Sequence, residues 1–462
     1  MNEKNFKLVE GIISRSYVSQ AQQASRQREN LLTELLAQRR LPEEGWDDYT
    51  IQCVLRDLSQ MDSNNFIENV GVGDREARVY SSIVRDRHFG LAHGLGRSGD
   101  LLAEQPKAAG SSLISKLAHY LVKDILKTSG LTTVKSCLIV PMATTMTIAL
   151  VLMSLRQKKP EARFVLFPRM DQKACFKSIY AAGLTPIVIP NVLQDDEIRT
   201  DLEELERVIA ERGSDQILAV LSTTSCFAPR APDRIIEIAI QCAKWDIGHV
   251  INNAYGLQST RCSHLIVESS RLGRVDAFVQ STDKNLLVPV GGAIVAACSS
   301  QGESILREIS QLYPGRASVS PLLDVFITAL SMGSSGYKSL LRERKEMFEF
   351  CKNKMREVME KYGEKVLDTP NNPFSMAVTL RNYCIEGSAT HIGSKLFTRF
   401  VSGVRVVDGK SSKTINGVTF EGYESHIDRY PHPYFTISCT IGITKEDIEG
   451  FIERLDKDSQ PN

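Results

Sequence analysis

The chain has 462 residues, more than one ordinary domain needs, and its 42% hydrophobic and 24% charged residues exclude a largely disordered protein. The 56 Lys and Arg nearly cancel the 55 Asp and Glu, which excludes a global charge that would draw the protein onto DNA or a lipid surface. Any RNA contact must therefore come from local basic patches. No apolar run approaches the roughly 18 residues that span a bilayer, and residues 1–10 contain no apolar signal-peptide core. The ten cysteines form no CxxC pair and no cluster with histidine, which predicts reduced, mostly buried thiols in a cytoplasmic protein without a metal site.

The first region, residues 1–60, is predicted to be helical. Residues 19–36 are rich in Gln, Arg and Glu, which is typical of an exposed or oligomer-forming helix. A stretch rich in Gly, Arg and Ser follows over residues 71–110. Loops of this length are uncommon in compact proteins and tend to be functional, so we expect this stretch to contribute to a site.

Between Ser136 and Cys298, short apolar runs alternate with segments of helical period. Such runs predict strands buried on both faces, and the helices between them predict parallel crossovers. A Gly-containing turn without a helix joins the last two runs, so one antiparallel neighbour is expected. The prediction is an α/β fold with a mostly parallel sheet of seven strands covered by helices, which binds ligands beyond the carboxyl ends of its strands. The expected strands are 137–140, 164–167, 186–189, 217–221, 249–251, 277–279 and 293–297, and the expected helices are 172–182, 201–212, 232–244 and 263–272.

The region after Ser320 is predicted to form a smaller α+β domain. It opens with helical segments, including a long charged one over residues 340–362. The composition therefore divides the chain into an N-terminal helical segment (1–60), a large α/β domain (61–320) and a C-terminal part (321–462). Shorter elements are expected at 375–380, 404–407, 434–441 and 445–455.

Lys284 lies in the sequence Ser281-Thr-Asp-Lys-Asn, directly after the apolar run 277–279. An ammonium group is costly to bury without a partner, so a lysine at the end of a buried strand is badly placed for a structural role. The position suits a lysine that forms a Schiff base with an aldehyde cofactor. Taken alone, the motif is more typical of a loop lysine that extends into solvent.

Two other predicted strands end in groups that suit a cofactor. Residues 141–145 (Pro-Met-Ala-Thr-Thr) precede a helix, where small residues expose backbone N–H groups that favour a phosphate; a simple helix cap is the alternative. Asn252 and Asn253 end the strand before the lysine strand, and an Asn or Asp there can contact the pyridine nitrogen of a cofactor, although the pair alone is more typical of a turn. The three groups occur in the order phosphate cradle, ring partner and lysine, which predicts an enzyme that uses pyridoxal phosphate (PLP).

Six motifs resemble those of the O-phosphoseryl-tRNA(Sec) selenium transferase family, and the resemblance covers nearly the whole chain. It implies a PLP-dependent enzyme of fold type I that works as a homotetramer with active sites at dimer interfaces. It also implies a reaction in which phosphoseryl-tRNA(Sec) and selenophosphate give selenocysteinyl-tRNA(Sec). The motifs begin at Gly71 (GVGDREAR), Gly94 (GLGRSGD), Ser222 (STTSCFAPR), Asn252 (NNAYG), Ser281 (STDKN) and Tyr313 (YPGRAS).

The same resemblance implies which residues hold the cofactor. Lys284 would bind it and move the α-proton of the substrate, while Asn252 would contact the ring nitrogen without the charge of an aspartate. Ala143 and Thr144 would hold the cofactor phosphate, joined by Arg75 across the dimer interface. Thr145 departs from the family, which tends to have Gly there.

The substrate phosphate needs fixed cations, which Arg supplies best. The resemblance assigns this role to the loop 96–106 and to the arginine of the Tyr-Pro-Gly-Arg motif. Each of these residues alone fits an ordinary surface position, and it is their joint occurrence that favours a site. The matching residues are Arg97, Ser98, Gln105 and Arg316.

Asp74 occupies a position where the family has Glu, thought to repel a free α-carboxylate. An amino acid esterified to tRNA has lost that charge, whereas free phosphoserine keeps it, and like charges close together in a low dielectric repel by several kcal/mol, on the order of 4. The resemblance therefore implies a substrate filter at Asp74. Because Asp is one methylene shorter than Glu, its reach is smaller.

The resemblance also implies contacts with the tRNA. Two arginines match family residues that touch it, and four more on the N-terminal helices add a basic edge unless they form an ordinary solvated helix face. The sequence ends at Asn462, before a basic tail that some relatives use on tRNA, so we expect that contact to be weak. The matching residues are Arg271 and Arg399, and the additional ones are Arg26, Arg28, Arg39 and Arg40.

Two other functions stay open on the sequence. The first is another PLP enzyme of the same fold that acts on free amino acids, either a lyase or a cysteine desulfurase. A desulfurase needs an exposed Cys on a mobile loop, and the candidates in the C-terminal part of the sequence are Cys384 and Cys439. The second is a non-catalytic RNA-binding scaffold, against which Lys284 and its phosphate cradle argue. Nucleotide hydrolysis by a P-loop is excluded because no GxxxxGK[ST] motif occurs.

Overall fold

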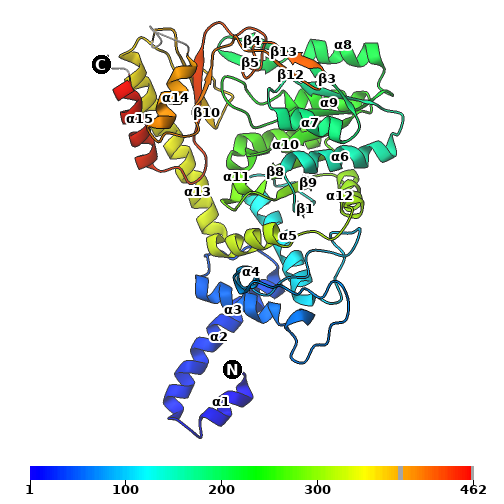
Figure 1. Cartoon of the computed structure of the whole chain (residues 1–462), viewed down its shortest axis with the longest axis vertical. Coiled ribbons are helices and arrows are strands. Elements are labelled where there is room, and N and C mark those ends of the chain that lie inside the picture. Colours follow the sequence, from blue (N-terminus) through cyan, green and yellow to red (C-terminus); the bar gives the residue numbers. More distant parts are fainter. Residues whose placement is uncertain (383–388, 459–462) are drawn as a thin grey trace.

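The computed structural model describes residues 1–382 and 389–458. A helix-covered sheet forms the centre of the molecule, a helical N-terminal part lies at one end of it, and a small C-terminal part is attached through one long helix (Figure 1). Among the described residues, no helix combines the length and the apolar character that crossing a membrane requires.

The central sheet has seven strands in the order β1-β9-β8-β7-β6-β2-β3. Neighbouring strands from β3 to β8 pair in parallel, whereas β9 is antiparallel to both β1 and β8. The predicted α/β fold, the number of strands and the antiparallel neighbour are thereby confirmed. The strands are β1 (Ser136–Val140), β2 (Phe164–Pro168), β3 (Thr185–Ile189), β6 (Ile217–Thr223), β7 (Gly248–Asn252), β8 (Ala277–Ser281) and β9 (Ala293–Ala297).

Helices cover the sheet so completely that every residue of β6, β7, β8 and β9 is buried. Strands buried on both faces have no polar side to present, which is why these segments are apolar at consecutive positions. Two groups of helices make this cover, since α6 packs with α7 and α12, and α9 packs with α8 and α10. They are α6 (Thr144–Lys158), α7 (Lys173–Ala181), α12 (Ser300–Leu312), α8 (Leu202–Arg212), α9 (Ile235–Lys244) and α10 (Thr260–Leu272).

The prediction of a helix-free turn between the last two strands was wrong. A short helix, α11 (Thr282–Leu286), follows β8 and ends at Leu287, which adopts a left-handed conformation with φ 54°. The buried Asn285 amide stabilises it by donating to the backbone oxygens of Ser281 (2.7 Å) and Ala254 (2.9 Å). This anchoring by a single asparagine has no periodic pattern, so the sequence did not reveal the helix.

A kinked helix connects the sheet to the C-terminal part. Helix α13 (Ser320–Glu360) bends at Gly333, where φ is 59°. The bend frees the N–H groups of Ser334 and Ser335, which donate to the carbonyls of Pro42 (2.8 Å) and Glu43 (2.9 Å). The kink thus joins α13 to the N-terminal part.

The C-terminal part has its own small apolar core, built on the second half of α13. Its three-stranded antiparallel sheet has the order β10-β14-β11, and two further hairpins were not predicted. Its elements are β10 (Ser375–Thr379), α14 (Thr390–Thr398), β11 (Arg405–Val407), β14 (Tyr434–Ser438) and α15 (Lys445–Asp458). The hairpin β12 (Lys413–Ile415) to β13 (Val418–Phe420) follows β11 in the chain, whereas the hairpin β4 (Asn191–Gln194) to β5 (Glu197–Thr200) lies between β3 and α8.

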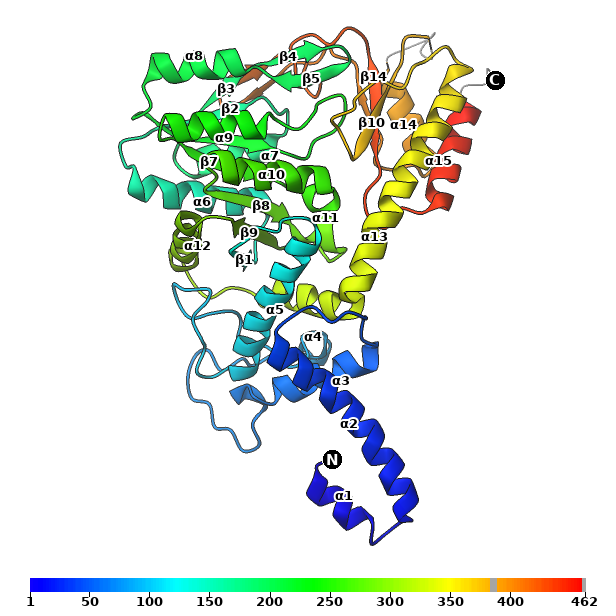
Figure 2. The ribbon, with the colours of Figure 1, turned by 180° about the vertical axis from the view of Figure 1, so that it is seen from behind.

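The N-terminal helices extend away from the rest of the molecule (Figure 2). The predicted exposed helix over residues 19–36 is confirmed by α2, of which only Val18 and Leu35 are buried. Long loops between α3 and α5 carry the Gly-rich motifs. The helices are α1 (Glu3–Val9), α2 (Arg15–Gln38), α3 (Asp48–Ser59), η1 (Ser63–Asn65), α4 (Ser82–Arg87) and α5 (Ala109–Thr128).

Candidate active site

Lys284 lies on α11, one turn beyond the carboxyl end of β8. Its backbone oxygen accepts a 2.6 Å hydrogen bond from the side-chain amide of Gln258, which belongs to the short helix η2 (Gly256–Gln258) that follows β7. The lysine turn is therefore fixed to the end of the neighbouring strand. We expected a partly desolvated side chain, but Lys284 is exposed in the single chain.

Asn252 ends β7 and is 2% exposed. Its Oδ1 accepts a hydrogen bond from the backbone N–H of Ala254 (3.2 Å), and its Nδ2 donates to the Sγ of Cys175 on α7 (3.1 Å). Burial raises the pKa of the Cys175 thiol to about 12, and the positive charge of Lys284 opposes that rise, which means that Lys284 lies within electrostatic reach of this group. Cys175 therefore links Asn252 to Lys284 in space.

Asn253, the second residue of the predicted ring partner pair, is turned into the core instead. Its Oδ1 accepts from the hydroxyl of Thr224 (2.6 Å) and its Nδ2 donates to the Oε1 of Gln280 (3.2 Å). Both ends of this amide are thus committed to neighbouring strand ends. Asn253 stabilises the sheet edge, and Asn252 is the residue available to a ligand.

The amino terminus of α6 suits a phosphate. Ala143 stands at the N-cap, and no side chain caps the helix, so the first-turn N–H groups keep no side-chain partner. Thr144 and Thr145 are half-buried beside them. These amides and the helix dipole favour an anion.

These three groups meet at one edge of the sheet. Because β1 and β8 are both antiparallel to β9 and β7 is parallel to β8, the three strands run in one direction. Their carboxyl ends carry residues 141–145, Asn252 and Lys284 in turn. The edge therefore presents an uncapped helix terminus, a buried amide and an amine, which are groups that fit the phosphate, ring nitrogen and aldehyde of PLP.

The predicted substrate-phosphate loop forms a separate structure beside α5. Arg97 and Asp100 exchange backbone hydrogen bonds of 2.9 and 2.8 Å around Gly99, which leaves Arg97 and Ser98 exposed at the tip. Gln105 is buried at 7% exposure, and its backbone N–H donates to Ser112 on α5 (3.0 Å).

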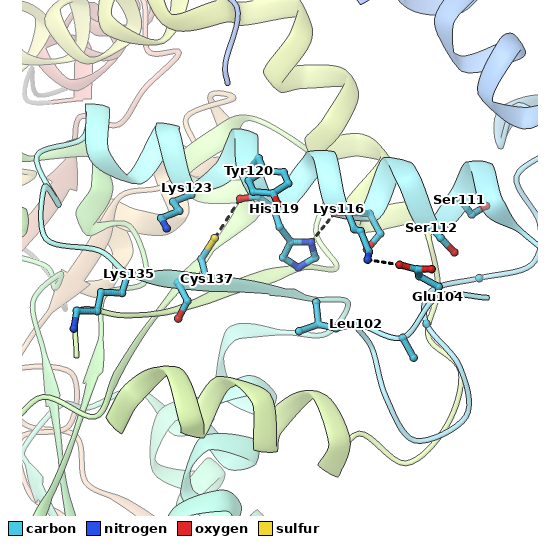
Figure 3. A pocket seen from close by; sticks show the side chains of 15 residues that line it. Leu102, Glu104, Ser111, Ser112, Lys116, His119, Tyr120, Lys123, Lys135 and Cys137 are labelled. Carbon is cyan, nitrogen blue, oxygen red and sulfur yellow. Dashed lines mark hydrogen bonds and ion pairs between the residues drawn. The ribbon is translucent and has the colours of Figure 1, made fainter. Parts of the chain in front are cut away.

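An ion pair between Glu104 and Lys116 holds the same loop to α5, as Figure 3 shows. The loop and α5 enclose a cavity of about 350 Å³, toward which Lys116 and Lys123 extend from the helix (Figure 3). The loop is therefore held by its base, while its tip stays open.

Arg316, Asp74 and Arg75 line one cavity of about 550 Å³. The Nη1 of Arg316 donates to the backbone oxygen of His93 (3.3 Å), whereas its Nε is buried without a hydrogen-bond partner among the described residues. The Nε atoms of Arg28, Arg199, Arg234 and Arg344 are likewise buried without a partner among the described residues, so this feature does not single out Arg316. Asp74 and Arg75 lie 3.7 Å apart, with their side chains 92% and 59% exposed.

The cavity with Arg316 includes neither Lys284 nor Asn252 nor residues 143–145. One chain thus holds two separate sets of predicted residues, which we call the cofactor edge (residues 141–145, Asn252 and Lys284) and the loop group (Arg97, Ser98, Gln105 and Arg316). Residues 141–145, Asn252 and Lys284 meet at one sheet edge. Arg97, Ser98 and Gln105, in contrast, do not line the cavity that contains Arg316.

The predicted tRNA residues lie outside both groups. Arg271 is exposed on α10 and forms a 2.7 Å ion pair with Glu268, while Arg399 is exposed after α14 and donates to the backbone oxygen of Arg454 (3.3 Å). Of the four arginines near the N-terminus, Arg28 stacks on Tyr49, Arg39 lies over Tyr120, Arg26 faces Glu3 at 3.8 Å and Arg40 lines a groove beside α2.

Sequence reasoning missed residues that shape both groups. Gln172 and Cys175 follow the end of β2, and that position was the available signal, since the other site residues were found at strand ends. In the loop, Arg78 donates to the backbone oxygens of Gly71 (2.5 Å) and Gly73 (3.4 Å), and Lys107 pairs with Glu76 at 2.5 Å. These contacts present Asp74 and Arg75 at the loop tip.

The desulfurase alternative loses one of its candidate nucleophiles. Cys439 is 1% exposed in the core of the C-terminal part, and a hydrogen bond with Cys351 lowers its pKa. A buried thiol cannot serve as an exposed nucleophile. Cys384 lies outside the described residues, and within the described ranges no cluster of His, Cys, Asp or Glu is arranged to hold a metal.

The architecture has relatives among PLP enzymes. Oryza sativa TDC, crystallised with PLP, superimposes with a TM-score of 0.55 over 88% of this chain and 95% of that chain, at 14% identity, which shows the fold alone. The sheet and this likeness define the fold class of the chain, the α/β fold of fold type I.

The family within that class follows from the sequence comparisons. Residues 61–460 match the O-phosphoseryl-tRNA(Sec) selenium transferase family. A transferase of this kind from Dictyostelium discoideum is 51% identical over 477 residues, covering 99% of each chain. An archaeal crystal structure of the enzyme superimposes with a TM-score of 0.88 at 31% identity, over 97% of this chain and 98% of that chain. The chain therefore belongs to the O-phosphoseryl-tRNA(Sec) selenium transferase family, PLP-dependent enzymes that convert phosphoseryl-tRNA(Sec) into selenocysteinyl-tRNA(Sec).

Proposed function

We propose that the cofactor edge and the loop group are the two halves of one active site for this reaction. The observation that carries the proposal is the meeting of the α6 terminus, Asn252 and Lys284 at one sheet edge. Ala143 and Thr144 bind the cofactor phosphate through the helix terminus, Asn252 contacts the ring nitrogen and Lys284 binds the aldehyde. PLP bound there supplies an electron sink for the negative charge that develops at the α-carbon of the substrate.

Within this site Lys284 acts as the acid–base group. With PLP and substrate bound, the Lys284 amine would be the group that removes the α-proton of the seryl moiety and later returns it. Lys284 is exposed in the single chain, so the substrate and the loops of a second copy can both approach it. Asn252 forms an uncharged hydrogen bond with the ring nitrogen, so the ring withdraws electrons less strongly than it would beside an aspartate. The departure of phosphate from the β-carbon must therefore supply more of the driving force for the elimination.

The loop group binds the leaving phosphate. Arg97, Ser98, Gln105 and Arg316 supply a guanidinium pair, a hydroxyl and an amide, which match the oxygens of a phosphate monoester. The position of Arg316 in the cavity of about 550 Å³ supports this role. The same donors fit selenophosphate, which we propose as the selenium donor that enters after phosphate leaves.

A second copy of the chain completes the site in this proposal. The loop before and after Asp74 exposes large apolar side chains to solvent, among them Ile67 (94%) and Val72 (93%). Exposed apolar surface of this extent indicates a partner. We propose that the loops of one copy cover Lys284 of another, that Arg75 reaches the cofactor phosphate across this interface, and that the assembly is a homotetramer.

The remaining assignments follow the same reasoning. We propose the division into residues 1–60, 61–320 and 321–462, with Arg271 and Arg399 on the tRNA surface, and a cytoplasmic location. The free thiols of the described cysteines agree with a reducing compartment. For Arg271, the ion pair with Glu268 has to open before the guanidinium can bind a phosphate.

Phosphate release from phosphoseryl-tRNA(Sec), and its absence with free phosphoserine, is the test of this function. Asp74 is proposed to exclude the free amino acid by repelling its α-carboxylate. Asp74→Ala should therefore raise turnover of free phosphoserine at least about tenfold relative to the tRNA ester, which corresponds to about 1.4 kcal/mol. Equal activity of the wild-type protein on both substrates would favour a lyase of free amino acids.

A further inference from the structure

A chain of hydrogen bonds includes Asn252, the residue that the proposed function assigns to the cofactor ring nitrogen. The Sγ–H of Cys175 donates to the Oε1 of Gln172 (3.2 Å), its sulfur accepts from the Nδ2 of Asn252 (3.1 Å), and the Oδ1 of Asn252 accepts from the backbone N–H of Ala254 (3.2 Å). Asn252 and Cys175 are both 2% exposed, whereas Gln172 reaches the open surface. The chain connects the start of α7 with the end of β7.

The direction of this chain is fixed by its two ends. A backbone N–H can only donate, so the atom of Asn252 that faces Ala254 must be the oxygen. Burial raises the pKa of the Cys175 thiol to about 12, so the thiol keeps its proton near neutral pH and uses it toward Gln172. The sulfur is then an acceptor, and the amide nitrogen of Asn252 must face it.

An amide nitrogen carries two hydrogens, and Cys175 takes only one of them. The second hydrogen is left for a ligand at the sheet edge. Asp171, which precedes Gln172 in the chain, is bound by Arg169 through contacts of 2.8 and 3.1 Å and by the backbone N–H of His426 (2.9 Å), so its carboxylate is already satisfied. The group that meets the ring nitrogen is therefore a neutral donor.

We propose that Cys175 is a positioning residue that holds Asn252 with an N–H toward the cofactor ring nitrogen, and that this nitrogen is consequently unprotonated. The inference rests on the assignment of Asn252 in the proposed function. If the ring nitrogen were protonated, its hydrogen would point at the N–H of Asn252 and no hydrogen bond could form. An unprotonated ring nitrogen has a lone pair that accepts this hydrogen bond. The sulfur fixes which end of the amide is presented.

The test uses the holoenzyme loaded with PLP that is ¹⁵N-labelled at the ring nitrogen, observed by ¹⁵N NMR together with the visible cofactor band and the cofactor Kd. The wild-type signal should be that of an unprotonated ring nitrogen, and Asn252→Asp should move it to the protonated position. Cys175→Ala should weaken cofactor binding about three- to tenfold and shift the signal, since an amide hydrogen bond contributes about 0.5–1.5 kcal/mol. Cys175→Ser, which keeps an acceptor, should restore both.

Cys242→Ala is the matched control, because Cys242 is fully buried on α9 and bonds to Gly248 at the other end of β7 (3.7 Å). It should lose stability without a change in the ¹⁵N signal. A protonated ring nitrogen in the wild-type protein would overturn the inference, as would a Cys175→Ala variant that matches Cys242→Ala or a serine variant that fails to restore the signal. If instead the wild-type protein has no cofactor band that depends on Lys284, the proposed function itself fails.

Discussion

Arg316 has one guanidinium nitrogen bound to the His93 carbonyl and another buried without a partner among the described residues. A cation held this way is ready for a phosphate but touches no part of the cofactor edge. Arg316→Ala should therefore reduce turnover about a hundredfold or more, because a charge-assisted hydrogen bond to the substrate phosphate contributes about 3 kcal/mol. Cofactor absorbance should stay unchanged.

Arg307→Ala supplies the control for that variant, because Arg307 is an exposed arginine on α12 outside the cavity with Arg316. Steady-state phosphate release and the cofactor band should both remain at wild-type values. Loss of the cofactor from the Arg316 variant would remove this residue from the substrate-phosphate role.

His249 on β7 gives the protein a predictable pH dependence. Burial lowers the pKa of His249 from 6.5 to about 4 and keeps the ring neutral, although its hydrogen bond to the backbone oxygen of Arg274 (3.0 Å) opposes this shift. The other ring nitrogen bonds to the hydroxyl of Ser222 (2.7 Å). Between these pH values the unfolded chain binds a proton that the folded chain does not. The free energy of unfolding should thus fall as the pH falls from 6.5 toward 4, by about 2 kcal/mol at pH 5 for this group.

Urea denaturation at pH 7 and pH 5 measures this loss. His249→Asn should be less stable at pH 7 but should lose less on acidification than the wild-type protein. The exposed His264 on α10 serves as the control, since His264→Asn should keep the wild-type difference between the two pH values. An unchanged pH difference in the His249 variant would show that other groups cause the acid loss.

At the scale of elements, the kink in α13 depends on Gly333. With φ at 59°, a Cβ at this position would meet the backbone N of Gly45 at 2.6 Å. Gly333→Ala should therefore destabilise the protein by about 1–3 kcal/mol and loosen the N-terminal part from α13. Gly336, three residues on, has helical geometry with its nearest contact at 3.6 Å, so Gly336→Ala should be neutral or stabilising.

Denaturation midpoints and proteolysis of the N-terminal helices would compare the two glycine variants. Equal stability of both would mean that the contacts of Ser334 and Ser335 with residues 42–43 contribute little. Faster cleavage before residue 60 in the Gly333 variant alone would confirm that the kink holds this part in place.

The sequence predicted the strands of the central sheet and most of the helices between them, but it missed α12 and the short elements that depend on single contacts. All seven strands of the central sheet were expected, because burial on both faces leaves a continuous apolar signature. Helix α11 and the hairpins β4–β5 and β12–β13 were not, since a short element held by one buried amide such as Asn285 has no period. For the site, the sequence could predict which residues lie at the ends of strands. It could not predict the hydrogen bond between Asn252 and Cys175, because these residues are 77 positions apart and only the structure brings them together.

At the scale of the whole molecule, the proposal places Lys284 and Arg75 of one site on different copies. Lys284→Ala and Arg75→Ala should each be inactive or nearly so. Mixed and refolded or co-expressed in equal amounts, they should regain about a quarter of wild-type activity, because half of the dimers are hybrids with one intact site of two. Activity no higher than that of the separate variants would place both residues in the same chain's site, and light scattering would report the assembly state in either case.

The most direct measurement is to reduce the purified yellow protein with borohydride, digest it and map the pyridoxyl group by mass spectrometry. The account predicts the label on Lys284, and no cofactor band in Lys284→Ala. A label on another lysine, such as Lys123 beside the cavity along α5, or a cofactor band that survives in Lys284→Ala, would contradict it.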